Sequence, residues 1–139
     1  YLPGDLNSKL DPWIGSIIDN FQHHFDDLTY FHMMRDKGII EVAPLAMMRG
    51  RTFNNSFIIV DEAQNSTIHE LKTIITRVGE DSKIVLLGDI EQIDTPYIDT
   101  TSNGLTIVAE KLRDEKISGH VTLIKGERSE LATLASKLI

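Results

Sequence analysis

The sequence predicts an α/β fold with a parallel β-sheet, because three short apolar runs alternate with helical patterns. The runs cover residues 57–60, 83–87 and 121–124 and are rich in β-branched side chains. Uninterrupted apolar strands are typical of parallel sheets that are buried on both faces. Because right-handed crossovers bring the carboxyl ends of such strands to one edge of the sheet, we expect a ligand site at that edge.

Two helices and a short strand are predicted before the first apolar run. Asp11 followed by Pro12 is typical of a helix N-cap with proline at the first helical position. Apolar residues at helical spacing then predict a helix over residues 12–25, and a second short helix is predicted over 28–36. Residues 39–42 are a candidate for a short strand.

Three further helices are predicted from the first run onward. Thr67 and Glu70 form a capping box at the start of one, and Gly79 is expected to end it. Its buried stripe is predicted to comprise Leu71, Ile74, Ile75 and Val78. The next helix is marked by Leu105, Val108 and Leu112. Ser129 caps the last, whose inward-facing residues are predicted to be Leu131, Leu134, Ala135 and Leu138.

Composition indicates an ordinary globular chain. Its 139 residues suit one domain or most of one, and the absence of cysteine excludes disulfides and thiolate metal sites. No apolar run is long enough to span a membrane, so we expect no membrane partner and a cytoplasmic location. The net charge of −7 argues against nucleic-acid binding by the chain as a whole, although it leaves room for a local basic strip. Because the sequence begins at Tyr1, we interpret it as part of a longer protein.

Two carboxylates follow the first predicted strand directly. Four apolar residues that run into Asp61 and Glu62 form the pattern called Walker B in P-loop NTPases. Asp61 can hold the water shell of a Mg²⁺ ion that bridges the β- and γ-phosphates of ATP, and Glu62 can polarise the attacking water. From this pattern alone, a strand that ends in solvated acids is an equally good interpretation.

A second polar cluster follows the next predicted strand. Gly88 is expected to allow a sharp turn, and Asp89 and Gln92 follow it. The amide of Gln92 can donate to a γ-phosphate oxygen and accept from water, so it can distinguish bound ATP from bound ADP. A surface turn would explain the motif if it stood alone, but it follows the acid pair by about one helical crossover. Together the two clusters predict the second half of a P-loop NTPase core.

Four arginines are candidates for phosphate contacts. Arg128 follows the third run and can contact the γ-phosphate in cis or a neighbouring subunit's nucleotide, or it forms a surface ion pair with an adjacent glutamate. Arg49 and Arg51 form a basic loop that either contacts RNA phosphates or a neighbouring nucleotide, or is solvated or ion-paired. Arg77, near a predicted helix end, is a further candidate, although a cation there also complements the helix dipole.

The phosphate-cradling Walker A loop is missing from this sequence. No glycine is followed five positions later by Gly-Lys-Ser or Gly-Lys-Thr. That loop supplies the backbone amides and the lysine that dominate triphosphate binding. We therefore expect an incomplete sheet, with the missing strand, loop and helix upstream, and ATP binding by this chain alone that is weaker than about millimolar.

The motifs resemble the PhoH-like family of ATPases. The likeness rests on residues 50–52, 57–65, 76–79 and 88–94, and it extends over essentially the whole chain. The ending, residues 120–132, is similar to the branch of the family in which a PIN-type ribonuclease domain precedes the ATPase.

The resemblance implies an incomplete three-layer sandwich of the RecA or helicase type, with residues 1–139 as the C-terminal portion of a single ATPase domain. It assigns Asp61 to Mg²⁺, Glu62 to the catalytic base, Gln92 to the γ-phosphate sensor and Arg128 to the late helicase arginine. It further implies a cytoplasmic protein that assembles as a homo-oligomeric ring, such as a hexamer, and acts on RNA.

The expected function is ATP hydrolysis coupled to RNA unwinding or remodelling in the intact protein. The residues expected to bind ATP and Mg²⁺ are Asp61, Glu62, Gly88, Asp89, Gln92 and Arg128. The alternative is a domain that binds RNA or protein without hydrolysis, which the missing cradle favours and the intact acid pair opposes. A phosphate-regulated kinase-like protein is a third possibility, but no acceptor-positioning motif supports it.

Overall fold

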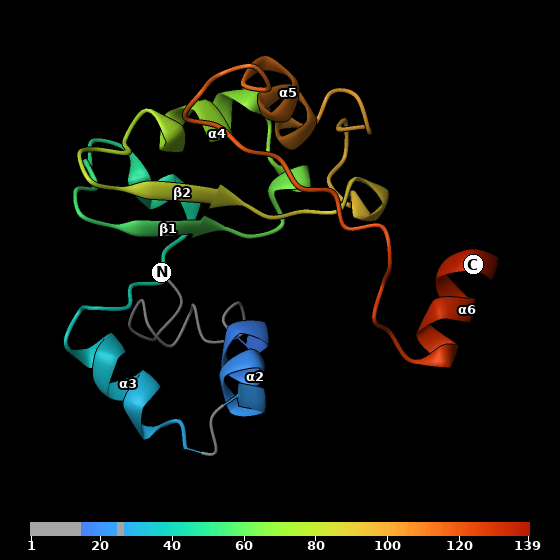
Figure 1. Ribbon diagram of the computed structural model, residues 1–139, viewed down its shortest axis with the longest axis horizontal. Coiled ribbons are helices and arrows are strands. Elements are labelled where there is room, and N and C mark those ends of the chain that lie inside the picture. Colours follow the sequence, from blue (N-terminus) through green and yellow to red (C-terminus); the bar gives the residue numbers. More distant parts are fainter. Residues whose placement is uncertain (1–14, 25–26) are drawn as a thin grey trace. The chain divides into compact units, whose positions relative to one another are not determined.

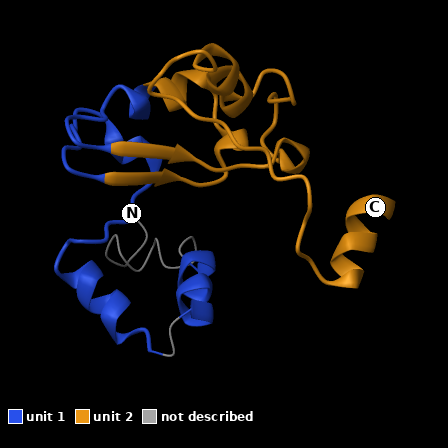
Figure 2. Cartoon of the chain, in the orientation of Figure 1, with its two compact units in different colours: residues 1–56, 73–82 blue, residues 57–72, 83–139 orange. Residues whose placement is uncertain are grey.

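The computed structural model describes residues 15–24 and 27–139. The chain divides into two compact units (Figure 2). Unit 1 comprises residues 1–56 and 73–82, and unit 2 comprises residues 57–72 and 83–139. Within the described part of the chain, no helix is both long enough and apolar enough to cross a membrane.

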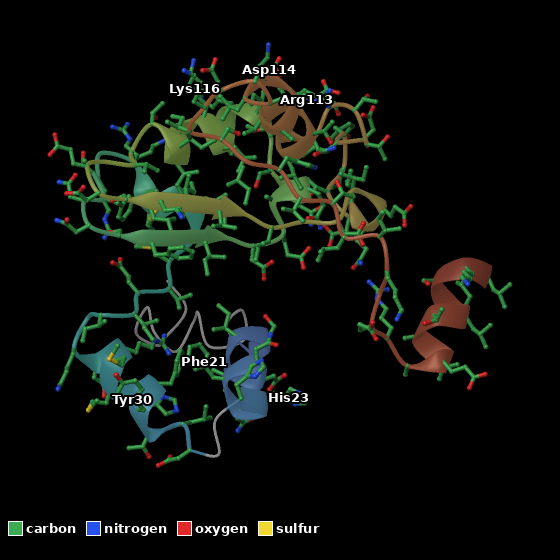
Figure 3. The ribbon with its side chains drawn as sticks, in the orientation of Figure 1. Phe21, His23, Tyr30, Arg113, Asp114 and Lys116 are labelled. Atoms are coloured by element: carbon green, nitrogen blue, oxygen red, sulfur yellow. The ribbon has the colours of Figure 1, made fainter. Side chains whose placement is uncertain are left out.

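Unit 1 contains the two helices predicted nearest the N-terminus. They are α2 (Gly15–His24) and α3 (Thr29–Asp36), and both predictions are confirmed over the described residues. The predicted start at Asp11 and Pro12 lies outside those residues. Phe31 of α3 is buried and packs against Phe21 of α2 with ring centroids 4.7 Å apart; Figure 3 labels Phe21.

The predicted strand over residues 39–42 is wrong. This segment is irregular and leads into a 3₁₀ turn, η2 (Leu45–Met48). Among the described residues no strand pairs with it, and Glu41 is instead bound through its side chain to Arg51. A side-chain ion pair thus fixes a segment that its β-branched residues alone would place in a sheet.

Helix α4 (Ile68–Ile75) crosses the boundary between the units, which lies between residues 72 and 73. Residues 73–82, the second part of unit 1, contain its end and the segment after it. Gly79 was predicted to end this helix, but the helix ends four residues earlier and Val78 forms an isolated parallel bridge with Phe53. A Cβ atom on Gly79 would overlap with the side chain of Asn54. Gly79 is therefore needed for a close approach of two segments, and not for a helix cap.

Unit 2 is built on a two-stranded parallel sheet (Figure 1). Strand β1 (Phe57–Val60) pairs in parallel with β2 (Lys83–Leu86), which confirms both strands and their direction. The pairing continues beyond the strands, because Leu87 N donates to Val60 O at 2.9 Å and Ala63 N donates to Leu87 O at 2.8 Å. The polar residues after both strands are thereby held at one edge of the sheet.

Burial of the sheet on both faces was expected and is wrong for β1. Val60 is 6% exposed, whereas Phe57 and Ile59, which alternate with the inward residues, are 66% and 58% exposed. Side chains of successive strand residues point to opposite faces, so one face of β1 lacks a covering layer among the described residues. The described residues thus form an α/β arrangement, but they do not show the expected three-layer sandwich.

Helices α4 and α5 begin with side-chain caps. In the capping box of α4, Thr67 N donates to Glu70 Oε2 at 2.9 Å and Glu70 N donates to Thr67 Oγ1 at 3.2 Å, as predicted. Asn103 caps α5 (Gly104–Lys111), which confirms the helix predicted there. Helix α5 packs against the 3₁₀ turn η3 (Ala63–Asn65) that follows β1. Charged side chains of the turn after α5, including Arg113, Asp114 and Lys116, project from unit 2 in Figure 3.

The third predicted strand, residues 121–124, is absent. The segment is irregular, and its apolar side chains Val121, Leu123 and Ile124 are exposed. Helix α6 (Glu130–Leu138) is confirmed, with Ser129 Oγ accepting from Ala132 N at 3.2 Å. Its leucines, however, are exposed and not inward-facing as predicted. No described strand pairs with residues 121–124. The apolar side chains of that segment and the leucines of α6 therefore stay exposed.

Candidate active site

The acid pair lies where β1 gives way to η3. Asp61 and Glu62 are both exposed, and Asp61 Oδ1 accepts from Glu62 N at 2.9 Å. Glu62 has a left-handed backbone, with φ 52° and ψ 36°. For a residue other than glycine this conformation costs about 1–2 kcal/mol, and such strain is common at functional sites. The chain therefore turns sharply at the residue predicted to be the catalytic base.

The second polar cluster forms a closed local network after β2. Asp89 caps the 3₁₀ turn η4 (Ile90–Gln92), because its Oδ1 accepts from Glu91 N at 2.9 Å. Its other oxygen, Oδ2, accepts from Gln92 Nε2 at 2.7 Å. The predicted phosphate sensor is thus exposed and hydrogen-bonded to a neighbouring carboxylate.

One buried amide joins the two clusters. Gln64 is 0% exposed. Its Nε2 donates to Glu62 Oε2 at 2.5 Å and more weakly to the backbone oxygen of Gln92 at 3.4 Å. Its Oε1 accepts from Asp89 N at 3.2 Å. A second amide crosses in the same way, since Asn65 Oδ1 accepts from the N–H of Asp94 at 3.0 Å.

These two amides were not assigned a role from the sequence. They follow the acid pair directly, and short polar side chains in such a turn are a weak signal for cross-links between loops. Burial is what distinguishes Gln64, and burial depends on the approach of the segment after β2. The structure thus brings Asp61, Glu62, Asp89 and Gln92 to one edge of the sheet, as the sequence predicted.

Gly88 has a different role from the predicted one. Its φ is not among the positive values of the described residues, so a sharp turn does not require glycine here. A Cβ at this position would lie 2.5 Å from Gln64 Oε1 and 2.7 Å from Leu105 Cδ2. Gly88 lacks a side chain because Gln64 and Leu105 occupy that space.

Arg128 is not joined to this cluster by any hydrogen bond or ion pair that the described residues show. It lies exposed in the irregular segment before α6, and the nearby Glu127 pairs with Lys125 at 3.1 Å. The predicted position of Arg128 at the sheet edge required a third strand over residues 121–124, and that segment is irregular. Its role as an arginine finger stays a prediction.

The three basic candidates of unit 1 differ in their surroundings. The guanidinium of Arg51 donates to both carboxylate oxygens of Glu41, at 2.6 and 2.9 Å, and its Cζ lies 4.7 Å from the ring centroid of Phe53. This hydrogen bonding lowers the pKa of Glu41 and raises that of Arg51. The ion-pair alternative is therefore confirmed for Arg51. Arg49 is exposed, and Arg77 follows the end of α4 with its Nε buried.

The acid pair suits a magnesium ion better than a metal held by protein alone. The described residues contain no group of three or more His, Asp or Glu side chains that could hold a metal. Mg²⁺ commonly takes one or two carboxylates and completes its shell with water and substrate phosphates. The single exposed carboxylate of Asp61 fits that pattern.

Comparison with known proteins identifies the family. The family described as "PhoH-like protein" matches residues 1–138. The chain belongs to the PhoH-like family. Its relatives include Protein PhoH2 of Bacillus subtilis, which is 50% identical over 142 residues and all of this chain. A PhoH-like protein of the same organism is 41% identical over 81% of the chain, and Protein PhoH2 of Thermobispora bispora is 34% identical over all of it.

The predicted resemblance to PhoH-like proteins is thus confirmed. The chain covers 32%, 34% and 31% of these three relatives, about a third of each.

Proposed function

We propose that the intact protein binds and hydrolyses ATP with Mg²⁺. One observation carries the proposal: a single buried amide, that of Gln64, binds both the carboxylate of Glu62 and the backbone of the loop containing Gln92. Ligands of parallel sheets bind at the carboxyl ends of the strands, where this network lies. Membership of the PhoH-like family, together with the Walker B pattern at Asp61 and Glu62, supports a nucleotide as that ligand.

Glu62 is proposed as the general base. Its Oε2 accepts from Gln64, and its other oxygen has no hydrogen bond among those the described residues show, so it can accept from a water molecule. A carboxylate that orients and deprotonates water in this way contributes about 10²–10⁴-fold to a rate. Asp61 would hold Mg²⁺ through water, and the bound ion would neutralise charge on the phosphate oxygens.

Gln92 is proposed as the sensor of the γ-phosphate. Its amide nitrogen donates to Asp89 Oδ2, and because the side chain is exposed it can exchange this partner for a phosphate oxygen. The amide nitrogen carries two hydrogens and Asp89 accepts one of them, so a γ-phosphate oxygen can accept the other or replace the Asp89 carboxylate. The loop would therefore differ between the ATP and ADP states.

Coupling to RNA and assembly as a ring complete the proposal. The resemblance of the motifs to the PhoH-like branch linked to RNA supports this step. The exposed Arg49 is the cation of the basic loop that is proposed to contact RNA phosphates. Arg128 is proposed to act on a nucleotide either in its own subunit or in a neighbour.

Substitution of the proposed base tests the function. In the intact protein, Glu62→Gln should lower ATP turnover by about 10²-fold or more and leave Mg²⁺-dependent ATP binding intact. The matched control is Glu110→Gln, which changes an exposed glutamate of α5 and should retain turnover. Full turnover by Glu62→Gln would overturn the assignment of the base. Absence of turnover in the unaltered intact protein would favour a domain that binds RNA or protein without hydrolysis.

A further inference from the structure

Gln64 is among the largest fully buried side chains of the described residues, and it is polar. A buried amide costs free energy unless its donors and acceptor are satisfied. Here both hydrogens of Nε2 have acceptors, and Oε1 has a donor. Both polar atoms of the buried side chain therefore have at least one hydrogen-bond partner.

The partners of Gln64 fix which way its amide points. The carboxylate of Glu62 and the backbone oxygen of Gln92 can only accept, whereas the N–H of Asp89 can only donate. The nitrogen must consequently face Glu62 and Gln92, and the oxygen must face Asp89. Exchanging the two ends would set an oxygen against a carboxylate.

The surrounding backbone leaves Gln64 little freedom to move. The N–H of Ala63 is bound to Leu87 O, which fixes the start of η3 against the end of β2. On the other side Gly88 approaches so closely that a single added carbon would overlap with Gln64 Oε1. The position of the Gln64 amide is therefore restricted by its packing, whereas Glu62, to which it donates, is exposed.

We infer that Gln64 is a positioning residue for ATP hydrolysis, an inference that rests on the proposed function. It fixes one oxygen of the Glu62 carboxylate and leaves the other, which has no hydrogen bond among those the described residues show, able to accept from water. Through Asp89 and Gln92 it also ties that carboxylate to the loop proposed to sense the γ-phosphate. A shift of the loop on nucleotide binding is thereby transmitted to the base through one side chain.

Two substitutions of Gln64 test the inference in the intact protein. Gln64→Met removes donors and acceptor at similar size, and Gln64→Glu keeps the shape but sets an acceptor against Glu62. Supporting residues of this kind typically contribute about 10–100-fold to activity, so kcat should fall by that factor. The KM for ATP should change by less than about threefold, because the phosphate and magnesium contacts are kept.

A matched control separates positioning from general stability. Asn103 is also a fully buried amide of unit 2, but its Nδ2 donates to Asp99 O, Thr100 O and Thr106 Oγ1 and to no residue of the site. Asn103→Asp removes buried donors as Gln64→Glu does. It should lower the melting temperature and leave kcat of the folded protein within about twofold.

A double-mutant cycle shows whether Gln64 acts through Glu62. In the Glu62→Gln background, Gln64→Met should lower the residual turnover by less than about twofold, because the group that it positions is already gone. In the double variant Glu62→Gln, Gln64→Glu the hydrogen bond is restored with donor and acceptor exchanged. The contact with the backbone oxygen of Gln92 is not restored, so the melting temperature should lie between those of Gln64→Glu and the unaltered protein, and the turnover should be that of Glu62→Gln.

Two results would overturn the inference. One is a kcat of Gln64→Met within about twofold of the unaltered protein, and the other is an equal loss from Gln64→Met in both backgrounds. If Glu62→Gln is inactive while Gln64→Met is fully active, the positioning role alone fails. If Glu62→Gln retains full turnover, the proposed function itself fails.

Discussion

Glu62 accepts a 2.5 Å hydrogen bond from the amide of Gln64, a side chain two positions further along the chain. The left-handed backbone of Glu62 and the 3₁₀ turn that follows it accompany this contact between near neighbours. Glu62 is exposed whereas Gln64 is buried, so the contact joins a side chain that can reach solvent to one that is fixed in the core.

Gly88→Ala should disturb the site by steric overlap. The added methyl group would lie 2.5 Å from Gln64 Oε1 and 2.7 Å from Leu105 Cδ2, so the buried amide must shift. Overpacking of this kind costs about 1–3 kcal/mol of unfolding free energy, and turnover of the intact protein should fall with it. Urea unfolding and ATP turnover measure the two effects.

The control for this substitution is Gly119→Ala. Nothing lies within 4 Å of a Cβ atom at Gly119. Its unfolding free energy should therefore change by no more than about 0.5 kcal/mol. Equal stability of the Gly88 and Gly119 variants would contradict the packing described here.

Asp99 should stabilise unit 2 above acidic pH. Hydrogen bonds from the side chain of Thr101 and the backbone of Ser102 and Thr101 lower the pKa of Asp99 to about 2 from 3.8. Because the folded-state pKa is below the unfolded value, this stabilisation is complete above about pH 4 and is lost as pH falls toward 2. Asp99→Asn should lower the melting temperature at neutral pH, and the difference should disappear near pH 2.

Melting curves between pH 2 and 7 check this prediction. The lowest pH is chosen because the pKa of Asp99 is about 2. Asp114→Asn, in an exposed turn, serves as the control and should melt as the unaltered protein does at every pH. A difference between Asp99→Asn and the unaltered protein that persists at the lowest pH would show that the carboxylate charge is not the cause.

Arg49→Ala should weaken binding of single-stranded RNA by the intact protein. A cation that contacts a phosphate contributes to affinity for any sequence, and its loss lowers the slope of log K against log salt by about one unit. Arg51 is unsuitable for this test because its guanidinium is bound to Glu41 and removal would disturb unit 1. Titrations at several salt concentrations measure the slope.

Lys116→Ala, which removes an exposed cation after α5, is the comparison for Arg49→Ala. It should leave both affinity and salt slope unchanged. An identical effect of the two substitutions would mean that Arg49 contributes only to the overall charge.

The sequence by itself determined strands β1 and β2, the cap of α4 and the polar residues that follow the two strands. The apolar runs 57–60 and 83–87 predicted β1 and β2, and the capping box of Thr67 and Glu70 predicted the start of α4. These signals lie within a few neighbouring residues, so backbone geometry and side-chain caps suffice to produce them. The positions of the acid pair and of Gln92 followed from the same runs.

Only the tertiary structure decided which of these segments meet. Residues 121–124 have strand-forming side chains but no described strand pairs with them, and hydrogen bonding in a sheet needs a partner that local sequence does not specify. Gln64 and Gly88 are the opposite example, because the structure gives them roles that the sequence did not predict. The sequence assigned no role to Gln64 and a turn to Gly88, yet the approach of η3 to the end of β2 buries the amide and leaves no room for a side chain at Gly88. Contacts between residues far apart in the chain determine burial, and burial made Gln64 part of the candidate site.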